Sequence, residues 1–313
     1  MKLLLILLAS LFVVETHAAA WRAETIAGTG TAGATGDGSP ATQAQLNQPF
    51  GIVRGPDGCI YFCEIAGAVV RKIDGQGVIT RVAAGFKQPH EIRFDKHGDL
   101  YVADTGNQRI VKVDLKTGQL RPLTNAAFRS PISLQFDARG DLLVCDIGVH
   151  RIQKVDMTTG VVTTVVGDGQ RTTLNGPRSL DCDRAGNLWV ALREGNQVLK
   201  FERGASAGQV IAGTGKSGLS GDGGPAKQAT LSGPKGIAVS PDGQRVFLAD
   251  TESHTIRVID LKTGTIDRVW GTGKKGSGQD QLARPHALFI EADDSLLVSD
   301  SENNRVLVLR PVP

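Results

Sequence analysis

Residues 88–114 read QPHEIRFDKHGDLYVADTGNQRIVKVD and decide the fold of this chain. Three runs in this segment alternate apolar and polar residues, and short polar turns that contain Gly98 and Gly106 separate them. A period of two bounded by glycine-containing turns indicates β-strands. The segment therefore predicts three strands joined by two tight turns.

This unit recurs along the chain, each time led by a proline. The six leading prolines lie 40 to 57 residues apart, at Pro49, Pro89, Pro131, Pro177, Pro234 and Pro285. A further β-like stretch follows five of the units, at residues 78–84, 119–124, 161–166, 209–212 and 265–270. Four strands per unit at this spacing are typical of a propeller blade, so the sequence predicts an all-β, six-bladed β-propeller.

The sixth outer strand is expected at the start of the chain. Residues 23–28 form a β-like stretch before the first leading proline, and the sequence IAGTG at residues 26–30 recurs at residues 211–215. We expect this stretch to complete the last blade, whose inner strands lie within residues 285–309. That pairing closes the ring and removes exposed strand edges, whereas five or seven blades would leave one strand unpaired. Residues 21–313 then form a single domain.

The N-terminus has the features of a secretory signal peptide, residues 1–20. Lys2 precedes an apolar run that ends at Val14, and small residues follow a short polar stretch. This order predicts cleavage after Ala20, with Ala18 as the alternative, and a secreted or periplasmic protein. The run is shorter than the roughly 20 residues of a membrane span, and no later stretch resembles a transmembrane segment.

Composition and cysteine spacing narrow the class of protein further. The net charge is +3 and no basic run occurs, which argues against nucleic acid as a partner. The cysteines lack the spacing of a metal knuckle or a dense disulfide scaffold, and they are Cys59, Cys63, Cys145 and Cys182. We interpret them as buried free thiols, while noting that export would permit their oxidation.

Two connections between units are longer than the rest. They contain the related sequences GDGSPA at residues 36–41 and GDGGPA at residues 221–226. Glycines followed by a proline and an Ala/Gln/Leu stretch predict a turn and then a short surface helix. No ladder of cation ligands surrounds Asp37 or Asp222, so we assign both carboxylates to the turns.

One carboxylate recurs at the end of the second strand. It is Glu64 in the first unit, Leu192 replaces it in the fourth, and in the others it is Asp104, Asp146, Asp250 or Asp300. Recurrence once per blade favours a structural role over catalysis. Each carboxylate should accept hydrogen bonds from the following turn and face the arginine five residues on, where the chain has one: Arg109, Arg151 and Arg305.

The position after each leading proline varies in its chemistry instead. It holds Phe50, His90, Ile132, Arg178, Lys235 and His286. Because this position starts the innermost strand, its side chain should face the central channel or its mouth. Two imidazoles, a guanidinium and an ammonium group that converge on one axis would bind an anion or support acid–base chemistry.

The repeats resemble those of the NHL family. The pattern Pro-x-x-Ile, Gly-Asp-Leu-Tyr-Val-Ala-Asp and Asn-x-Arg-Ile at residues 89–110 recurs at 131–152 and 285–306. The stretch from AGTG at residues 27–30 to Pro49 is similar to exported bacterial members. This resemblance covers nearly the whole mature chain and implies a propeller of the predicted kind.

Two enzymatic propeller families show weaker similarity. Peptidyl-hydroxyglycine amidating lyases hold zinc with three histidines that follow such prolines, and His90 and His286 match two of those places. Arg178 occupies the third place, where a fixed cation would repel the metal. A weaker divalent metal site, for Zn or Ca, would then need Glu91 or Glu64. Gluconolactonase-type propellers coordinate a divalent cation with Glu, Asn and Asp in the channel, and the sequence alone does not identify the matching residues.

The leading functional hypothesis is a monomeric, non-catalytic recognition module. Its ligand would be a protein, peptide or glycan that meets the channel mouth at Phe50, Arg178, Lys235 and the two long connections. The alternative is a lyase or hydrolase that uses His90 and His286 on a small anionic substrate, with Arg178 stabilising negative charge. A third possibility is a scaffold within a larger assembly.

Overall fold

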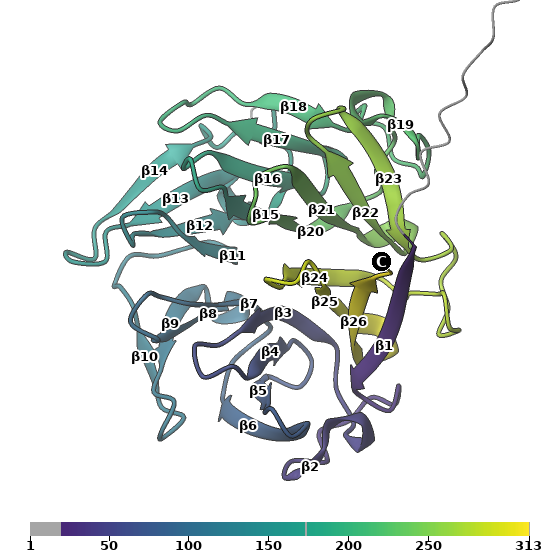
Figure 1. Ribbon diagram of the computed structural model, residues 1–313. Helices are drawn as coiled ribbons and strands as arrows, with labels where there is room; N and C mark the ends of the chain where they lie inside the picture. The colour runs from purple at the N-terminus through teal and green to yellow at the C-terminus, as the bar shows by residue number, and fades with distance from the viewer. Residues whose placement is uncertain (1–19, 173, 313) are drawn as a thin grey trace, which may run out of the picture.

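The structure is a computed structural model that describes residues 20–172 and 174–312. Six sheets stand around a central axis as the blades of a propeller (Figure 1). This arrangement confirms the predicted all-β, six-bladed fold. The predicted signal peptide lies outside the described residues except for Ala20, and in those residues no helix is long and apolar enough to cross a membrane.

Each blade runs from an inner strand at the axis to an outer strand at the rim. Blades one and two consist of β3 (Pro49–Arg54), β4 (Ile60–Glu64), β5 (Val69–Ile73), β6 (Val78–Ala84) and of β7 (Pro89–Phe94), β8 (Leu100–Asp104), β9 (Arg109–Val113), β10 (Leu120–Pro122). Blades three and four consist of β11 (Pro131–Phe136), β12 (Leu142–Asp146), β13 (Arg151–Val155), β14 (Val162–Val166) and of β15 (Pro177–Cys182), β16 (Leu188–Leu192), β17 (Gln197–Phe201), β18 (Gln209–Ala212).

Blade five consists of β20 (Pro234–Val239), β21 (Arg245–Asp250), β22 (Thr255–Asp260) and β23 (Thr265–Trp270), and blade six of β24 (Pro285–Ile290), β25 (Leu296–Asp300), β26 (Arg305–Pro311) and β1 (Trp21–Ala27). Four single 3₁₀ turns follow second strands, at η2 (Thr105–Asn107), η3 (Ile147–Val149), η5 (Thr251–Ser253) and η6 (Ser301–Asn303).

The first strand of the described chain closes the ring. β1 pairs antiparallel with β26 from Trp21 opposite Pro311 to Ala27 opposite Val306. In Figure 1 the purple N-terminal strand lies beside the yellow C-terminal strand. The predicted closure is therefore confirmed, and it joins the two ends of the chain within one sheet.

A register shift follows the proline that begins every inner strand. In blade two, Pro89 is opposite Asp104 and Glu91 is opposite Ala103, so His90 is skipped by the ladder. The same shift occurs after the other five leading prolines. Proline has no N–H to donate and is tolerated at the first residue of a strand, and a bulge re-aims the side chain that it leaves unpaired. In each blade the residue after the leading proline is therefore left without a partner in the strand ladder.

The core lies between the faces of neighbouring blades. One apolar cluster joins blades one and two through residues such as Val70, Ile92 and Val102, and another joins blades four and five through residues such as Val198 and Ile237. The alternating pattern of each strand supplies one buried face to each neighbour. All four cysteines are free, and all except the partly buried Cys182 are buried.

The two long connections differ from the predicted surface helices. Each contains a two-residue strand, β2 (Ser39–Pro40) or β19 (Gly224–Pro225), followed by a single 3₁₀ turn, η1 (Ala41–Gln43) or η4 (Ala226–Gln228). β2 pairs with β6 and β19 pairs with β23, so blades one and five gain a fifth strand. The prolines have extended backbone conformations, which excludes them from the first turn of a helix.

The aspartates of these connections form ion pairs with buried arginines that the sequence patterns did not reveal. Arg71 and Arg257 are almost fully buried. Arg71 Nε donates to Asp37 Oδ1 at 3.0 Å. Arg257 Nη2 lies 2.6 Å from Asp222 Oδ1. A buried guanidinium needs such a partner, so these carboxylates fix the long connections against blades one and five.

Candidate functional site

The residues after the leading prolines gather at one end of the channel. We call these six residues the mouth ring: Phe50, His90, Ile132, Arg178, Lys235 and His286. The Phe50 ring stacks on His286 with centroids 4.0 Å apart and meets His90 edge-on at 5.2 Å. Lys235 Nζ lies 3.2 Å from His286 Nε2. Four of the six blades therefore meet through direct side-chain contacts, while Ile132 packs into the apolar cluster between blades three and four.

Arg178 is a buried cation without a protein partner. Its residue surface is 7% exposed. Within residues 20–172 and 174–312, no carboxylate forms an ion pair with its guanidinium and no acceptor forms a hydrogen bond with it. Burial lowers the pKa of Arg178 to about 10, and the charge of Arg193 adds to this shift. Five N–H donors thus remain available at the channel mouth.

The two histidines of the mouth ring are neutral at neutral pH. Burial, followed by the charge of Arg178, lowers the pKa of His90 to about 3. Burial and the charge of Lys235 hold the pKa of His286 well below its ordinary value. His90 Nδ1 lies 2.9 Å from the Gln88 carbonyl oxygen, so the neutral ring donates there. Nε2 of His286 accepts from the Lys235 ammonium group.

Lys235 differs from Arg178 because it has a counter-ion. Its Nζ lies 2.9 Å from Oε1 of Glu252. Burial lowers the pKa of Lys235 to about 8, and the hydrogen bond to Glu252 opposes that shift. Glu252 also accepts from Arg284 at 2.6 Å. The sequence patterns missed this carboxylate, although Glu252 and Glu302 occupy matching places after the strand-end aspartates of blades five and six.

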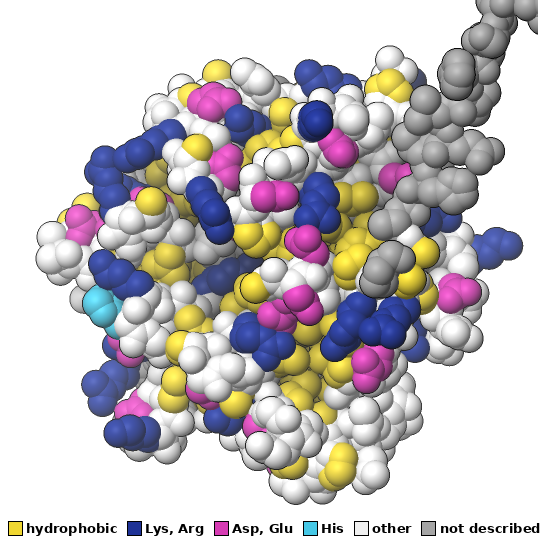
Figure 2. Space-filling model, in the orientation of Figure 1, with side chains coloured by type: hydrophobic (Ala, Val, Ile, Leu, Met, Phe, Trp, Pro, Cys, Tyr) yellow, Lys and Arg dark blue, Asp and Glu magenta, His cyan; other side chains and the backbone are white. Residues whose placement is uncertain are grey.

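A pocket of about 310 Å³ lies at the opposite end of the channel, where polar side chains such as Arg93 and Asp181 alternate with apolar ones such as Leu288. Residues at or near the ends of all six inner strands line it. Asp181 accepts from Gln135 Nε2 and from the Val239 N–H, and Glu91 accepts from Arg93 Nη1 at 2.7 Å. The face shown in Figure 2 is hollowed near its centre, where Lys or Arg side chains are visible. The channel carboxylates are therefore already engaged by protein donors.

The residues present do not fit a divalent metal. Among the described residues no group of three or more His, Cys, Asp or Glu side chains is arranged to hold one. Phe50 contacts both imidazoles, Glu91 is paired with Arg93, and Glu64 is paired with Arg71 at 3.3 Å. The positive charges of Arg178 and Lys235 also disfavour a cation. The structure gives no support to a Zn or Ca site at His90, His286 and Glu91.

The recurring aspartates engage the turns that precede and follow them. Asp104 pairs with Arg109 at 2.8 Å. Asp300 pairs with Arg305 at 2.7 Å. The carboxylate of Asp146 instead accepts the backbone N–H groups of residues 129, 130 and 148.

Blade three departs from the expected aspartate–arginine pairing, and blade five has a threonine, Thr255, at the arginine position. Arg151 donates to the Asp168 carbonyl oxygen at 3.3 Å. The expected pairing of Arg151 with Asp146 is therefore wrong, because backbone donors take both oxygens. In blade five, Asp250 accepts the Ser232 N–H and lies 3.7 Å from Arg257.

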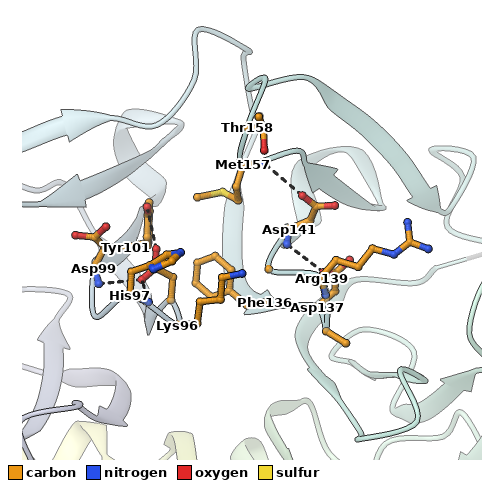
Figure 3. Close-up of a pocket in the computed structure, with 13 residues that line it drawn as sticks. Lys96, His97, Asp99, Tyr101, Phe136, Asp137, Arg139, Asp141, Met157 and Thr158 are labelled. Carbon is orange, nitrogen blue, oxygen red and sulfur yellow. Dashed lines mark hydrogen bonds between the residues drawn. The ribbon is translucent and has the colours of Figure 1, made fainter.

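A pocket of about 460 Å³ lies between the hairpins of blades two and three (Figure 3). Asp95 Oδ1 accepts the His97 and Asp99 N–H groups, and Asp137 Oδ1 accepts those of Arg139 and Asp141. Both carboxylates stabilise the turns of their own hairpins, and this structural role accounts for their presence in the pocket. The mouth ring is the stronger candidate site.

Comparison with known proteins agrees with this architecture. A family model described as the SMP-30/gluconolactonase/LRE-like region matches residues 93–312. The chain belongs to this family. Membership of the NHL family, predicted from the repeats, stays a prediction.

Curated proteins and solved structures resemble this family member over most of its length. The chain is 27% identical over 274 residues to Protein SUPPRESSOR OF QUENCHING 1, chloroplastic, of Arabidopsis thaliana, covering 82% of this chain and 23% of that protein. It spans less than a quarter of the curated relatives that it matches. An auxiliary nutrient binding protein from Bacteroides thetaiotaomicron superposes with a TM-score of 0.76 at 14% identity, covering 94% of this chain and 77% of that one.

A gluconolactonase from Xanthomonas campestris superposes with a TM-score of 0.67 at 13% identity, covering 86% of this chain and 87% of that one. At identities this low, the two structures show a shared fold alone.

Proposed function

We propose that this protein is a recognition module whose channel mouth binds a negatively charged group of a protein, peptide or glycan ligand. The observation that carries the proposal is the unpaired, buried guanidinium of Arg178. Burying a charge without a partner costs several kcal/mol, and an incoming anion removes that penalty. A planar guanidinium matches a carboxylate or phosphate with two parallel hydrogen bonds.

The neighbours of Arg178 suit an anion. Lys235 adds a second positive charge, and its counter-ion Glu252 is partly exposed, so a ligand can compete for the ammonium group. The two neutral imidazoles add no charge of their own. Phe50 offers an apolar surface beside them.

We also propose that the protein works outside the cytoplasm, because its N-terminus predicts export.

The test measures the melting temperature of residues 21–313 with sodium acetate, sodium glucuronate or sodium phosphate. Sodium chloride at matched ionic strength is the reference. A ligand at ten times its Kd stabilises the folded state by about 1.4 kcal/mol, so we expect a rise of a few degrees. Arg178→Met should lose this response, while Arg184→Met, which removes an exposed arginine of the same blade, should keep it. Equal responses of the wild type and Arg178→Met would overturn the proposal.

The second candidate is a lyase or hydrolase that acts on a small anionic substrate. It is supported by membership of a family whose description includes gluconolactonase and by the two neutral imidazoles, which have the protonation state of general bases. It ranks second because the described residues do not fit the metal of related propellers. Turnover of a sugar lactone that is lost in His90→Gln and His286→Gln but kept in His97→Gln would place this candidate first.

A further inference from the structure

Blade four lacks the carboxylate that ends the second strand of every other blade. Leu192 occupies this position, opposite Pro177 in the strand ladder. In the other five blades the carboxylate accepts backbone N–H groups from the preceding connection, as Asp104 does from Lys87. The mouth end of blade four therefore carries one negative charge fewer, and its arginines have no acid of this kind beside them.

Arg193 is a second arginine of blade four without a partner. It begins the turn after β16 and is exposed, and its backbone N–H donates to the carbonyl oxygen of Gly176, two residues before Arg178. In the part of the chain that the structure describes, its guanidinium forms no ion pair and donates no hydrogen bond. The adjacent acid, Glu194, pairs with Arg171 instead. Burial, and then the charge of Arg193, lower the pKa of Arg178, so the two positive charges act on each other.

The position of Arg193 in its blade lies next to the following blade. In three other blades this position holds a hydroxyl side chain: Thr105, Thr251 or Ser301. Each hydroxyl group donates to the carbonyl oxygen of the proline that leads the following blade. For Arg193 the following blade is blade five, whose inner strand β20 packs against β16 and carries Lys235 directly after its leading proline. Arg193 therefore places its charge on the side of Arg178 that faces Lys235.

The other half of the mouth is apolar. In blades one and three the position that matches Arg193 holds Ile65 and Ile147, which are both partly exposed. Ile65 packs on the apolar cluster that contains Phe50, and Ile147 packs on the cluster that contains Ile132. The mouth is therefore divided, with positive charges on blades four and five and apolar side chains on blades one and three.

We infer that Arg178 and Arg193 together bind a doubly charged anion, the phosphate monoester of an apolar group. The inference rests on the proposed function and specifies its ligand. Two cations without counter-ions are balanced by two negative charges, and a phosphate monoester carries about 1.5 to 2 of them at pH 7. Its oxygens accept N–H donors from both guanidinium groups, whereas one carboxylate balances only one of the two charges. The apolar group of the ligand lies against the apolar half of the mouth and removes it from water.

Isothermal titration calorimetry of residues 21–313 tests the inference with three probes, at about pH 7.5, where a phosphate monoester is doubly charged. Phenyl phosphate combines the double charge with an apolar group. Glycerol phosphate carries the double charge on a polar group, and benzoate combines a single charge with the apolar ring. Phenyl phosphate should bind at least about tenfold more tightly than each of the other two probes.

The variant Arg193→Thr separates this inference from the proposed function. Blades two and five hold threonine at the same position, so the fold accepts it. Arg193→Thr should weaken the binding of phenyl phosphate at least about tenfold and that of benzoate less than about threefold. Arg178→Met should lose both ligands, and Arg184→Met, which removes an exposed arginine at the other end of the blade, should keep both.

Two results would overturn the inference and leave the proposed function in place, provided that Arg178→Met still loses binding. One is an equal loss of affinity for phenyl phosphate and benzoate in Arg193→Thr, which would mean that Arg193 does not recognise the second charge. The other is glycerol phosphate that binds as tightly as phenyl phosphate, which would mean that the apolar half takes no part. Wild-type protein that binds none of the three probes would overturn the proposed function as well. Equal melting temperatures of Arg193→Thr and the wild type exclude misfolding as the cause of a loss.

Discussion

Replacing Arg178 with methionine should make the protein more stable while it removes anion binding. Methionine has a similar volume and leaves no charge at the channel mouth. The pKa of Arg178 falls from 12.5 to about 10 on burial. This pKa difference corresponds to a penalty of roughly 3 kcal/mol for keeping the buried guanidinium charged. The value is an upper bound for the gain on substitution, because methionine also loses the weak attraction between Arg178 and nearby groups. We therefore expect Arg178→Met to raise the free energy of unfolding by about 1 to 3 kcal/mol.

Urea unfolding followed by tryptophan fluorescence measures this difference. The midpoint should rise with an unchanged slope, because the surface exposed on unfolding stays the same. The melting temperature should rise by about 2 °C for each kcal/mol in a chain of this size. Arg184→Met, which removes an exposed arginine of the same blade, should change the free energy of unfolding by no more than about 0.5 kcal/mol. A loss of stability in Arg178→Met would refute the reasoning, because it would mean that the guanidinium already has a favourable partner in the ligand-free protein.

Two further predictions concern the mouth ring and the closure of the propeller. Between pH 7 and pH 5 the free energy of unfolding should fall by about 2 kcal/mol. The unfolded chain takes up protons on His90 and His286, whereas in the folded chain burial holds the pKa of His90 near 3 and that of His286 well below 6.5. Burial raises the pKa of Asp250 to about 6, so Asp250 takes up a proton in the folded state and offsets part of this loss. The prediction would be contradicted if the stability of His90→Gln depended on pH as strongly as that of the wild type. Deleting residues 21–28 removes β1 from blade six, so the backbone amides of β26 should be the first to lose protection against hydrogen exchange. Unchanged protection of β26 would show that the ring does not depend on this closure.

The repeats determined much of the mouth ring as well as the blades. The residue after every leading proline has no partner in the strand ladder, so the position of the prolines in the sequence identified the side chains of the mouth ring. The contacts of Phe50 with both histidines follow from that position. The recurring aspartates were less predictable. Asp104 pairs with its arginine, but Asp146 is surrounded by backbone donors from the preceding connection, whose course the repeat does not specify.

The sequence by itself therefore determined the blades, their number, the closure of the ring and the position of the candidate site. These features depend on period-two alternation, turn residues and proline, which act within a few residues of the chain. Only the tertiary structure decided that Lys235 is paired with Glu252 while Arg178 is unpaired, and that Arg71 and Arg257 are buried beside Asp37 and Asp222. Hydrogen bonds and ion pairs are decided over distances of a few ångströms. A repeat pattern places each strand in its blade, but it does not specify which side-chain atoms from separate segments come within that distance.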